Sequence, residues 1–383
     1  MKPAKILHLH SSFDLGGKEA RAVQLMNKFG GAAHHTIISA VPSVMSARDA
    51  IDKKIKVEFP DETKGEAPPL HGKPALGRYR AISDYMREFD LILSYNWGSM
   101  DGVMAHTIHC QKKGLAPLIH HEDGFNHDEI KTLNWKRNLF RTIALQRCYG
   151  VVVPSKILQD IATTTWKQPS KRVHRIANGI DLKRYAKKPQ FGSFPGLKKN
   201  HGSVIVGTVA GLRPVKDLTK LVRAVAAAGD NVMLAIAGEG PDKDVILAEA
   251  ARLNMSERLI MPGFLKDPAR FIGLFDIFAL SSLSEQFPIS LAEAMAAGVP
   301  ALSTDVGDVR NMVSRVNMEY IVPQNDEYAY IEALKKLVND KELRQKIGDE
   351  NQNKAQVELD ENTMFDRYRN IYGGAMQIPN FAR

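Results

Sequence analysis

Short apolar runs alternate with segments of helical spacing along the first half of the chain. The first run, Ala4–His10, is rich in Ile and Leu and ends at a segment that contains Ser and Gly. Residues 18–29 then place apolar side chains three and four positions apart, which is typical of an amphipathic helix. The further runs that we predict as buried strands are His35–Val41, Leu91–Tyr95, Pro117–His121 and Gly150–Pro154. Helical segments separate most of these runs, and this alternation predicts a parallel sheet that is covered on both faces.

The alternation breaks between Asp181 and Gly202, where Lys, Pro, Gly, Phe and Asn accumulate, and we interpret this segment as a linker. A second alternating series then begins. Its predicted strands are Val204–Ala210, Val232–Ala237, Leu259–Met261, Ile277–Ser281, Pro300–Ser303 and Tyr320–Val322. The pattern therefore predicts an α/β fold with two units, residues 1–190 and 191–360, and each unit begins with a strand and a Gly-bearing loop. Because α/β units bind ligands beyond the carboxyl ends of their strands, we expect a ligand crevice between the two sheets.

The composition is that of an ordinary globular protein. Hydrophobic residues make up 44% of the 383 residues and charged residues 25%, which excludes collagen, a mucin stalk and a wholly disordered chain. Two cysteines, Cys110 and Cys148, cannot form a disulfide framework, so a reducing compartment is expected. The first residues lack the apolar core of a signal peptide, and no apolar stretch reaches the roughly 20 residues that span a bilayer. We therefore expect a cytoplasmic protein without a membrane span.

Positive charge is concentrated in the first half of the chain. The whole chain carries a net charge of +9, but residues 1–190 contain 30 Lys and Arg against 18 Asp and Glu, and residues 191–383 are net negative. A basic half can bind nucleic acid, an anionic membrane surface or an acidic substrate, or it can be a solvated surface without a partner. Nucleic acid is the weakest of these options, because zinc-finger spacing, an Arg-rich tail and basic strands interleaved with aromatics are all absent. Docking of the basic half on an anionic membrane surface, at the inner face of the cell membrane, remains a hypothesis.

The strongest local signal is the segment Ser284–Met295. Pro288 stands where a helix can begin, since the first helical position needs no N–H group. The N-terminus of such a helix offers free amides to an anion. Glu285 precedes the helix and Glu293 lies about two turns inside it, so two carboxylates could hold sugar hydroxyls by charge-assisted hydrogen bonds. From spacing alone, Glu285 could equally stabilise the helix dipole, and Glu293 could be a solvated helix residue.

These two glutamates, followed by Ala294–Asp308, resemble the Glu-x7-Glu nucleotide-sugar signature of the family 4 glycosyltransferases. Further segments agree with that family in order and spacing: Gly16-Gly17, Ile176–Asp181, Gly211–Asp217 and Ala237–Pro241. The resemblance covers most of the chain and is strongest from 204 to 323. It implies a GT-B fold, in which two Rossmann-like domains face each other across a cleft. It also implies that a C-terminal helix within residues 361–383 crosses back to the N-terminal domain.

The resemblance implies roles for particular residues of the C-terminal domain, which would hold the donor. Arg213 and Lys216 would neutralise the diphosphate and stabilise it as the leaving group, although on sequence alone they could be two solvated cations. Glu285 would hold hydroxyls of the donor sugar, and Glu293 would hold the ribose diol. The backbone near the start of the helix would contact the sugar and the phosphates, and the residues concerned are Phe287, Pro288, Ile289, Ser290 and Leu291.

Three glycines and one histidine complete the candidate site. Gly16, Gly17 and Gly238 would let the backbone approach the donor, although Gly-x-Gly-x-x-Gly is absent and simple turns are the alternative. The resemblance implies that a His at a strand end of the first domain contacts the donor sugar. His120 is the better match, and His121 would replace it if the register shifts by one residue. A histidine satisfied by the backbone is the structural alternative.

No metal or cofactor is predicted. The segment that begins His121-Glu122 lacks the second His of His-Glu-x-x-His, and Asp242-Lys243-Asp244 is interpreted as the start of a helix. The leading hypothesis is a retaining glycosyltransferase that moves a sugar from a nucleoside-diphosphate sugar, with UDP favoured, to a hydroxyl of a glycan or glycolipid. The alternatives are a non-catalytic nucleotide-sugar-binding subunit and a nucleotide-sugar epimerase or phosphorylase. The basic first half suggests a lipid-linked acceptor, and a role in cell-surface polysaccharide or glycolipid biosynthesis follows from that suggestion.

Overall fold

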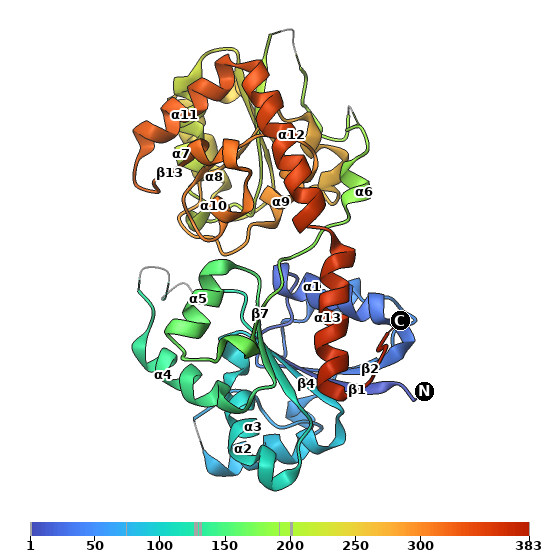
Figure 1. The fold of residues 1–383 in the computed structure, drawn as a ribbon. Helices are drawn as coiled ribbons and strands as arrows, with labels where there is room; N and C mark the ends of the chain where they lie inside the picture. Colours follow the sequence, from blue (N-terminus) through green and yellow to red (C-terminus); the bar gives the residue numbers. More distant parts are fainter. Residues whose placement is uncertain are drawn as a thin grey trace. The chain divides into compact units, whose positions relative to one another are not determined.

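The computed structural model describes residues 2–73, 75–125, 129, 132–190, 192–199 and 202–382. It divides into two compact units, of which unit 1 comprises Met1–Ala177 together with Asn362–Arg383, and unit 2 comprises Asn178–Glu361 (Figure 1). Both units are built on a fully parallel sheet with helices on its faces. The predicted α/β architecture with two units is therefore what the structure shows.

Unit 1 has a seven-stranded sheet in the order β3-β2-β1-β4-β5-β6-β7. The strands are β1 (Ala4–His10), β2 (Ala33–Ser39), β3 (Val57–Glu58), β4 (Leu91–Tyr95), β5 (Leu118–His121), β6 (Gly150–Val153) and β7 (Val173–Arg175). The helices are α1 (Gly17–Phe29), α2 (Leu76–Tyr85), α3 (Met100–Lys113), α4 (Trp135–Ala144), α5 (Lys156–Thr164) and α13 (Glu361–Met376). The direction of winding reverses between β1 and β4, which makes their carboxyl ends the switch point of this sheet.

Unit 2 has a six-stranded sheet in the order β10-β9-β8-β11-β12-β13. The strands are β8 (Val204–Val209), β9 (Val232–Ala237), β10 (Leu259–Gly263), β11 (Ile277–Leu280), β12 (Ala301–Thr304) and β13 (Ile321–Val322). The helices are α6 (Leu182–Tyr185), α7 (Leu218–Ala228), α8 (Lys243–Arg252), α9 (Ile289–Ala296), α10 (Val309–Met312), α11 (Glu327–Asn339) and α12 (Lys341–Glu358). Its switch point lies between β8 and β11.

Helix α13 completes the core of unit 1. Its side chains Phe365, Tyr368 and Tyr372 are buried in one cluster with residues of β1, β2 and β4, and the Tyr372 hydroxyl lies 2.9 Å from Nε2 of His121 on β5. The last helix of the chain thus belongs to the same unit as the first strand, as predicted (Figure 1).

The boundary between the units lies earlier than the predicted linker. Residues 178–190, which the sequence pattern places in the first domain, belong to unit 2. The reason is local packing: Ile180 forms a β-bridge with Asp360, and Tyr185 is buried and bonded to Glu293 of α9. The composition change that begins at Asp181 therefore falls within unit 2 and does not mark the crossing between the units.

Candidate functional site

The switch point of unit 2 brings two loops together. The first follows β8 and contains a short 3-10 turn, Pro214–Lys216, and the second follows β11. The hydroxyl of Ser281 donates to the carbonyl of Lys216 over 2.9 Å, and the amide of Leu283 donates to the carbonyl of Val215 over 2.8 Å. These two bonds fix the basic turn against the start of the loop that carries Glu285.

Lys216 and Glu285 form an ion pair between these loops. The ammonium Nζ of Lys216 lies 2.5 Å from Oε1 of Glu285, and the hydroxyl of Ser282 donates to the same oxygen over 2.7 Å. The two charged side chains remain 18% and 11% exposed, so a ligand can still reach them. Arg213 begins the same turn, its side chain is exposed, and within the described part of the chain it makes no ion pair.

The Glu285 loop rests on the segment after β12. The hydroxyl of Thr304 donates to the carbonyl of Ser282 over 2.7 Å, and the amide of Asp308 donates to the carbonyl of Gln286 over 3.0 Å. Gly307 has φ +53°, and a Cβ at this position would overlap the carbonyl of Glu285. The segment Ala294–Asp308, which the resemblance picked out, thus contains Thr304, Gly307 and Asp308, which hold the Glu285 loop in place. The sequence analysis assigned no role to Ser282, Thr304 or Gly307.

The N-terminus of α9 is open. Pro288 is its N-cap residue, and the amide of Leu291 donates to the carbonyl of Pro288 over 3.1 Å. Among the residues that the structure describes, the amides of Phe287, Ile289 and Ser290 have no hydrogen-bond acceptor. Of the five positions predicted to contact the donor, these three offer free donors to an anion.

Glu293 lies in a different environment from Glu285. The hydroxyl of Tyr185 donates to Oε1 of Glu293 over 2.7 Å. Burial raises the pKa of Glu293 to about 7, and the hydrogen bond from Tyr185 opposes this rise. Sequence reasoning missed Tyr185, which stands 108 positions before Glu293. No contact joins Glu293 to Glu285 or Lys216 within the described residues.

Gly238 lies at the turn after β9. With φ +155° it occupies a backbone region that side chains disfavour, and a Cβ there would overlap the carbonyl of Ala210. Gly240 packs in the same way against the carbonyl of Leu212. Close packing against the backbone of Ala210 and Leu212, just before the Pro214–Lys216 turn, therefore explains why both positions are glycine. Direct contact of Gly238 with a donor stays a prediction.

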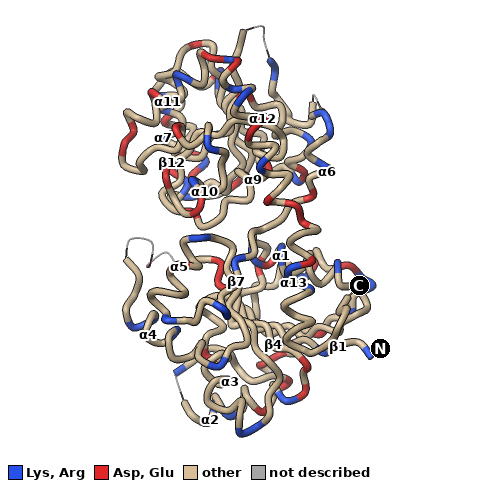
Figure 2. Tube along the Cα trace, in the orientation of Figure 1, with Lys and Arg blue, Asp and Glu red and all other residues tan. Residues whose placement is uncertain are grey.

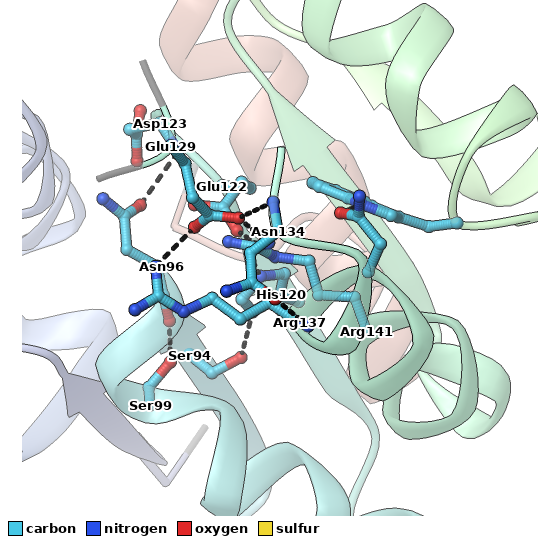
Figure 3. Close-up of polar contacts among 12 residues, drawn as sticks. Ser94, Asn96, Ser99, His120, Glu122, Asp123, Glu129, Asn134, Arg137 and Arg141 are labelled. Carbon is cyan, nitrogen blue, oxygen red and sulfur yellow. Dashed lines mark hydrogen bonds and ion pairs between the residues drawn. The ribbon is translucent and has the colours of Figure 1, made fainter. Parts of the chain in front are cut away.

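In unit 1, both candidate histidines lie in the interior. His120 has no exposed surface, and its Nδ1 lies 2.9 Å from the hydroxyl of Ser94, while its Nε2 lies 3.7 Å from a carboxylate oxygen of Glu122 (Figure 3). His121 is equally buried, and burial lowers its pKa to about 3. Side chains of unit 1 contact both rings: Ser94 lies beside His120, and the Tyr372 hydroxyl lies beside His121. Contact of His120 with the donor sugar stays a prediction.

The charged residues packed at this edge of the sheet come from α1 and from Asp123 after β5, and most of their side-chain surface is buried. Nη2 of Arg21 donates to Oδ2 of Asp123 over 2.8 Å, and Lys18 forms an ion pair with Glu19. Gly16 is the N-cap of α1 in extended conformation and Gly17 is its first residue, so both lie between β1 and α1 at the switch point of unit 1, and their contact with a donor stays a prediction. Asp123, two positions after His121, was missed because the motif directed attention to the histidines.

Two observations bear on metals and membranes. Among the described residues, no three His, Cys, Asp or Glu side chains are grouped so that they could hold a metal ion. Asp242 is the N-cap of α8 and Asp244 lies in its first turn, in agreement with the interpretation of that segment as a helix start. None of the helices described is both long and apolar enough to cross a bilayer.

The geometry is that of a doubly wound α/β protein whose second unit presents a lysine, a carboxylate and open helix amides at its switch point, a combination suited to a phosphorylated ligand with hydroxyl groups. The model of the family described as "Glycosyl transferases group 1" matches residues 192–354. The putative glycosyltransferase EpsF of Bacillus subtilis is 31% identical over 319 residues, which are 79% of each chain. The chain therefore belongs to the glycosyltransferase group 1 family.

Other relatives are matched over shorter stretches. N-acetyl-alpha-D-glucosaminyl L-malate synthase of Bacillus anthracis is 26% identical over 211 residues, and the chain thus spans about half, 54%, of that protein's length. Among solved structures, Anabaena Alr3699/HepE in complex with UDP superposes with a TM-score of 0.79 at 19% identity, covering 97% of this chain and all of that one. These likenesses confirm the predicted GT-B fold, while the cleft between facing domains stays a prediction.

Proposed function

We propose that this chain is a retaining glycosyltransferase that moves a sugar from a UDP-sugar to a hydroxyl of a lipid-linked glycan or glycolipid, at the cytoplasmic stage of cell-surface polysaccharide or glycolipid synthesis. Two relatives are named as enzymes that act on diphosphoundecaprenol-linked sugars, from Escherichia coli at 26% identity and Campylobacter jejuni at 27%. The UDP complex of the structural neighbour supports uridine as the base.

The observation that carries the proposal is the Lys216–Glu285 pair at the β8/β11 switch point. An ammonium and three open amides can take up the negative charge of a diphosphate, and the charge grows on that group when the bond to the sugar breaks. Arg213, exposed on the same turn, is available as a second cation. Glu285, partly exposed, can accept hydrogen bonds from sugar hydroxyls while Lys216 and Ser282 hold it in place.

In the reaction that we propose, the bond between the anomeric carbon and the diphosphate oxygen breaks, and the acceptor oxygen bonds to that carbon on the same face. The proton of the acceptor hydroxyl passes to the leaving phosphate oxygen. Lys216 and Arg213 supply the positive charge at the diphosphate, so we propose that no divalent metal is required. Ionised Glu293 would accept hydrogen bonds from the two hydroxyls of the ribose.

The test begins with calorimetric titration of UDP, GDP and ADP into wild type, Lys216→Met and a matched control, Lys346→Met, at an exposed position of α12. We expect one diphosphate to bind, and to bind at least about tenfold more weakly to Lys216→Met than to the control. Absence of binding to the folded wild type would refute the proposal. Product analysis by NMR then decides the chemistry: retained anomeric configuration is expected, and conversion of the donor in the absence of acceptor would instead establish an epimerase.

A further inference from the structure

Helix α4 of unit 1 exposes a stripe of apolar residues besides those that it packs against the core. Trp135, Leu139 and Ile143 are 69%, 53% and 44% exposed, whereas Arg141 of the same helix is completely buried. The three apolar residues are spaced four apart, so they form one stripe along the helix. A helix on a globular unit ordinarily turns its apolar face inward, and an exposed apolar stripe opposite a buried charge therefore needs an explanation.

The buried arginine prevents the helix from turning. Nε of Arg141 lies 3.2 Å from Glu122 and Nη1 lies 3.4 Å from Glu129 (Figure 3). Its guanidinium also lies over the rings of Trp97, Phe125 and Trp166, at 4.9, 5.3 and 5.1 Å from their centroids. Rotating α4 to bury the stripe would leave these buried carboxylates without their partner, which is strongly unfavourable. The stripe is therefore held at the surface by the core of unit 1.

The surface around the stripe is positively charged. Residues 132–159 contain no Asp or Glu, and Lys136 and Arg147 are exposed in and just after α4. Helix α3 lies beside α4, where the hydroxyl of Thr107 donates to the carbonyl of Ala144, and it carries an exposed Lys112 of its own. Figure 2 shows Lys and Arg positions, and no Asp or Glu, along α4.

We infer that the outer face of α4, defined by Trp135, Leu139 and Ile143, docks on an anionic lipid bilayer. The apolar side chains enter the interface between headgroups and acyl chains, where a Trp ring is well accommodated, and Lys136 and Arg147 meet the lipid phosphates. Charge complementarity selects this occupant, since an exposed apolar stripe with a basic border matches a negatively charged membrane surface.

The first test is co-sedimentation with vesicles of phosphatidylglycerol and phosphatidylcholine, and with vesicles of phosphatidylcholine alone. Wild type is expected to bind the anionic vesicles and to be released as salt rises from about 0.1 M to about 1 M, because the screening length falls from about 10 Å to about 3 Å. The double variant Leu139→Gln/Ile143→Gln should lose at least about tenfold in vesicle partitioning. Val357→Gln is the matched control, because Val357 is a 79% exposed apolar residue on α12.

A second readout reports on the helix directly. Trp135 is the most exposed of the residues in the stripe, so its emission should shift to shorter wavelength on anionic vesicles, and Trp135→Phe should abolish the shift. Equal vesicle binding by the stripe variant and wild type would overturn the inference. So would a wild-type dimer in analytical ultracentrifugation that becomes a monomer in the stripe variant without any vesicle binding, because the face would then join two copies of the chain. Nucleotide titration of the stripe variant should match wild type, which separates failure of docking from failure of the proposed function.

Discussion

The environment of Glu293 makes a sharp prediction for Glu293→Gln. Burial raises the pKa of this carboxyl from 4.5 to about 7, so ionisation of Glu293 works against folding. Because the pKa is raised in the folded state, the unfolded chain loses the proton first. Wild-type stability is therefore unaffected by this group below pH 4.5, falls as the pH rises towards about 7, and is level above it.

The magnitude follows from the size of the shift. Each pKa unit corresponds to about 1.4 kcal/mol, so the rise from 4.5 to about 7 amounts to about 3 kcal/mol at alkaline pH. Gln has nearly the same shape and can still accept the hydrogen bond from Tyr185, but it does not ionise. We expect Glu293→Gln to gain up to about 3 kcal/mol of stability near pH 8 and almost nothing near pH 4, and to bind nucleotide more weakly.

Urea denaturation at several pH values measures this effect. All three Trp residues lie in unit 1, so Trp fluorescence follows that unit, whereas far-UV circular dichroism follows both. The gain in stability of Glu293→Gln should appear in the unfolding transition followed by circular dichroism. Where unit 1 and unit 2 unfold in separate transitions, it should be absent from the transition followed by Trp fluorescence. Glu350→Gln, at an exposed position of α12, should show no pH-dependent gain. An equal gain at acid and alkaline pH, or a loss at alkaline pH, would refute the reasoning.

Three further predictions follow from contacts described above. Calorimetry should show that Lys216→Met weakens the binding of a nucleoside diphosphate at least about fivefold more than the binding of the corresponding monophosphate. An equal loss of affinity for both ligands would place Lys216 away from the second phosphate. Gly307→Ala should lower stability by about 1–3 kcal/mol, because the new Cβ meets the Glu285 carbonyl at positive φ; an unchanged urea midpoint would contradict this. Unit 1 should lose stability as the pH falls below about 6.5, since burial lowers the pKa of its interior histidines and the unfolded chain binds the protons first. These are His8, His10, His35 and His121. If the urea midpoint detected by Trp fluorescence stays constant from about pH 7 to about pH 5, these histidines do not make the stability of unit 1 depend on pH.

The elements of the sheets were predictable because each buried strand is a continuous apolar run. All eleven predicted strands begin and end within two residues of the observed bounds, as Leu91–Tyr95 and Val232–Ala237 illustrate. Strand β3 and strand β7 were missed, because each contains a single apolar residue, Val57 and Val173, and so leaves no apolar run.

The candidate site was predictable where its residues follow neighbouring strands of one sheet, and not where they lie outside the strand pattern. Lys216 and Glu285 follow neighbouring strands, so the order of strands brings them together. Tyr185 could not be found in this way, since its contact with Glu293 depends on the segment 178–190 folding with unit 2. At the end of β5, a strand pattern does not reveal that both histidines are buried and that Asp123 pairs with Arg21 of α1.

The return of α13 to unit 1 has a consequence for biosynthesis. Unit 2 is one continuous stretch of chain and can complete its core as soon as residue 361 has left the ribosome. Unit 1 begins to emerge first, yet its core lacks Phe365, Tyr368 and Tyr372 until translation reaches the last helix. Through that interval the apolar surface that α13 covers in unit 1 stays exposed, so we expect the nascent N-terminal half to be the part of the chain most prone to aggregation.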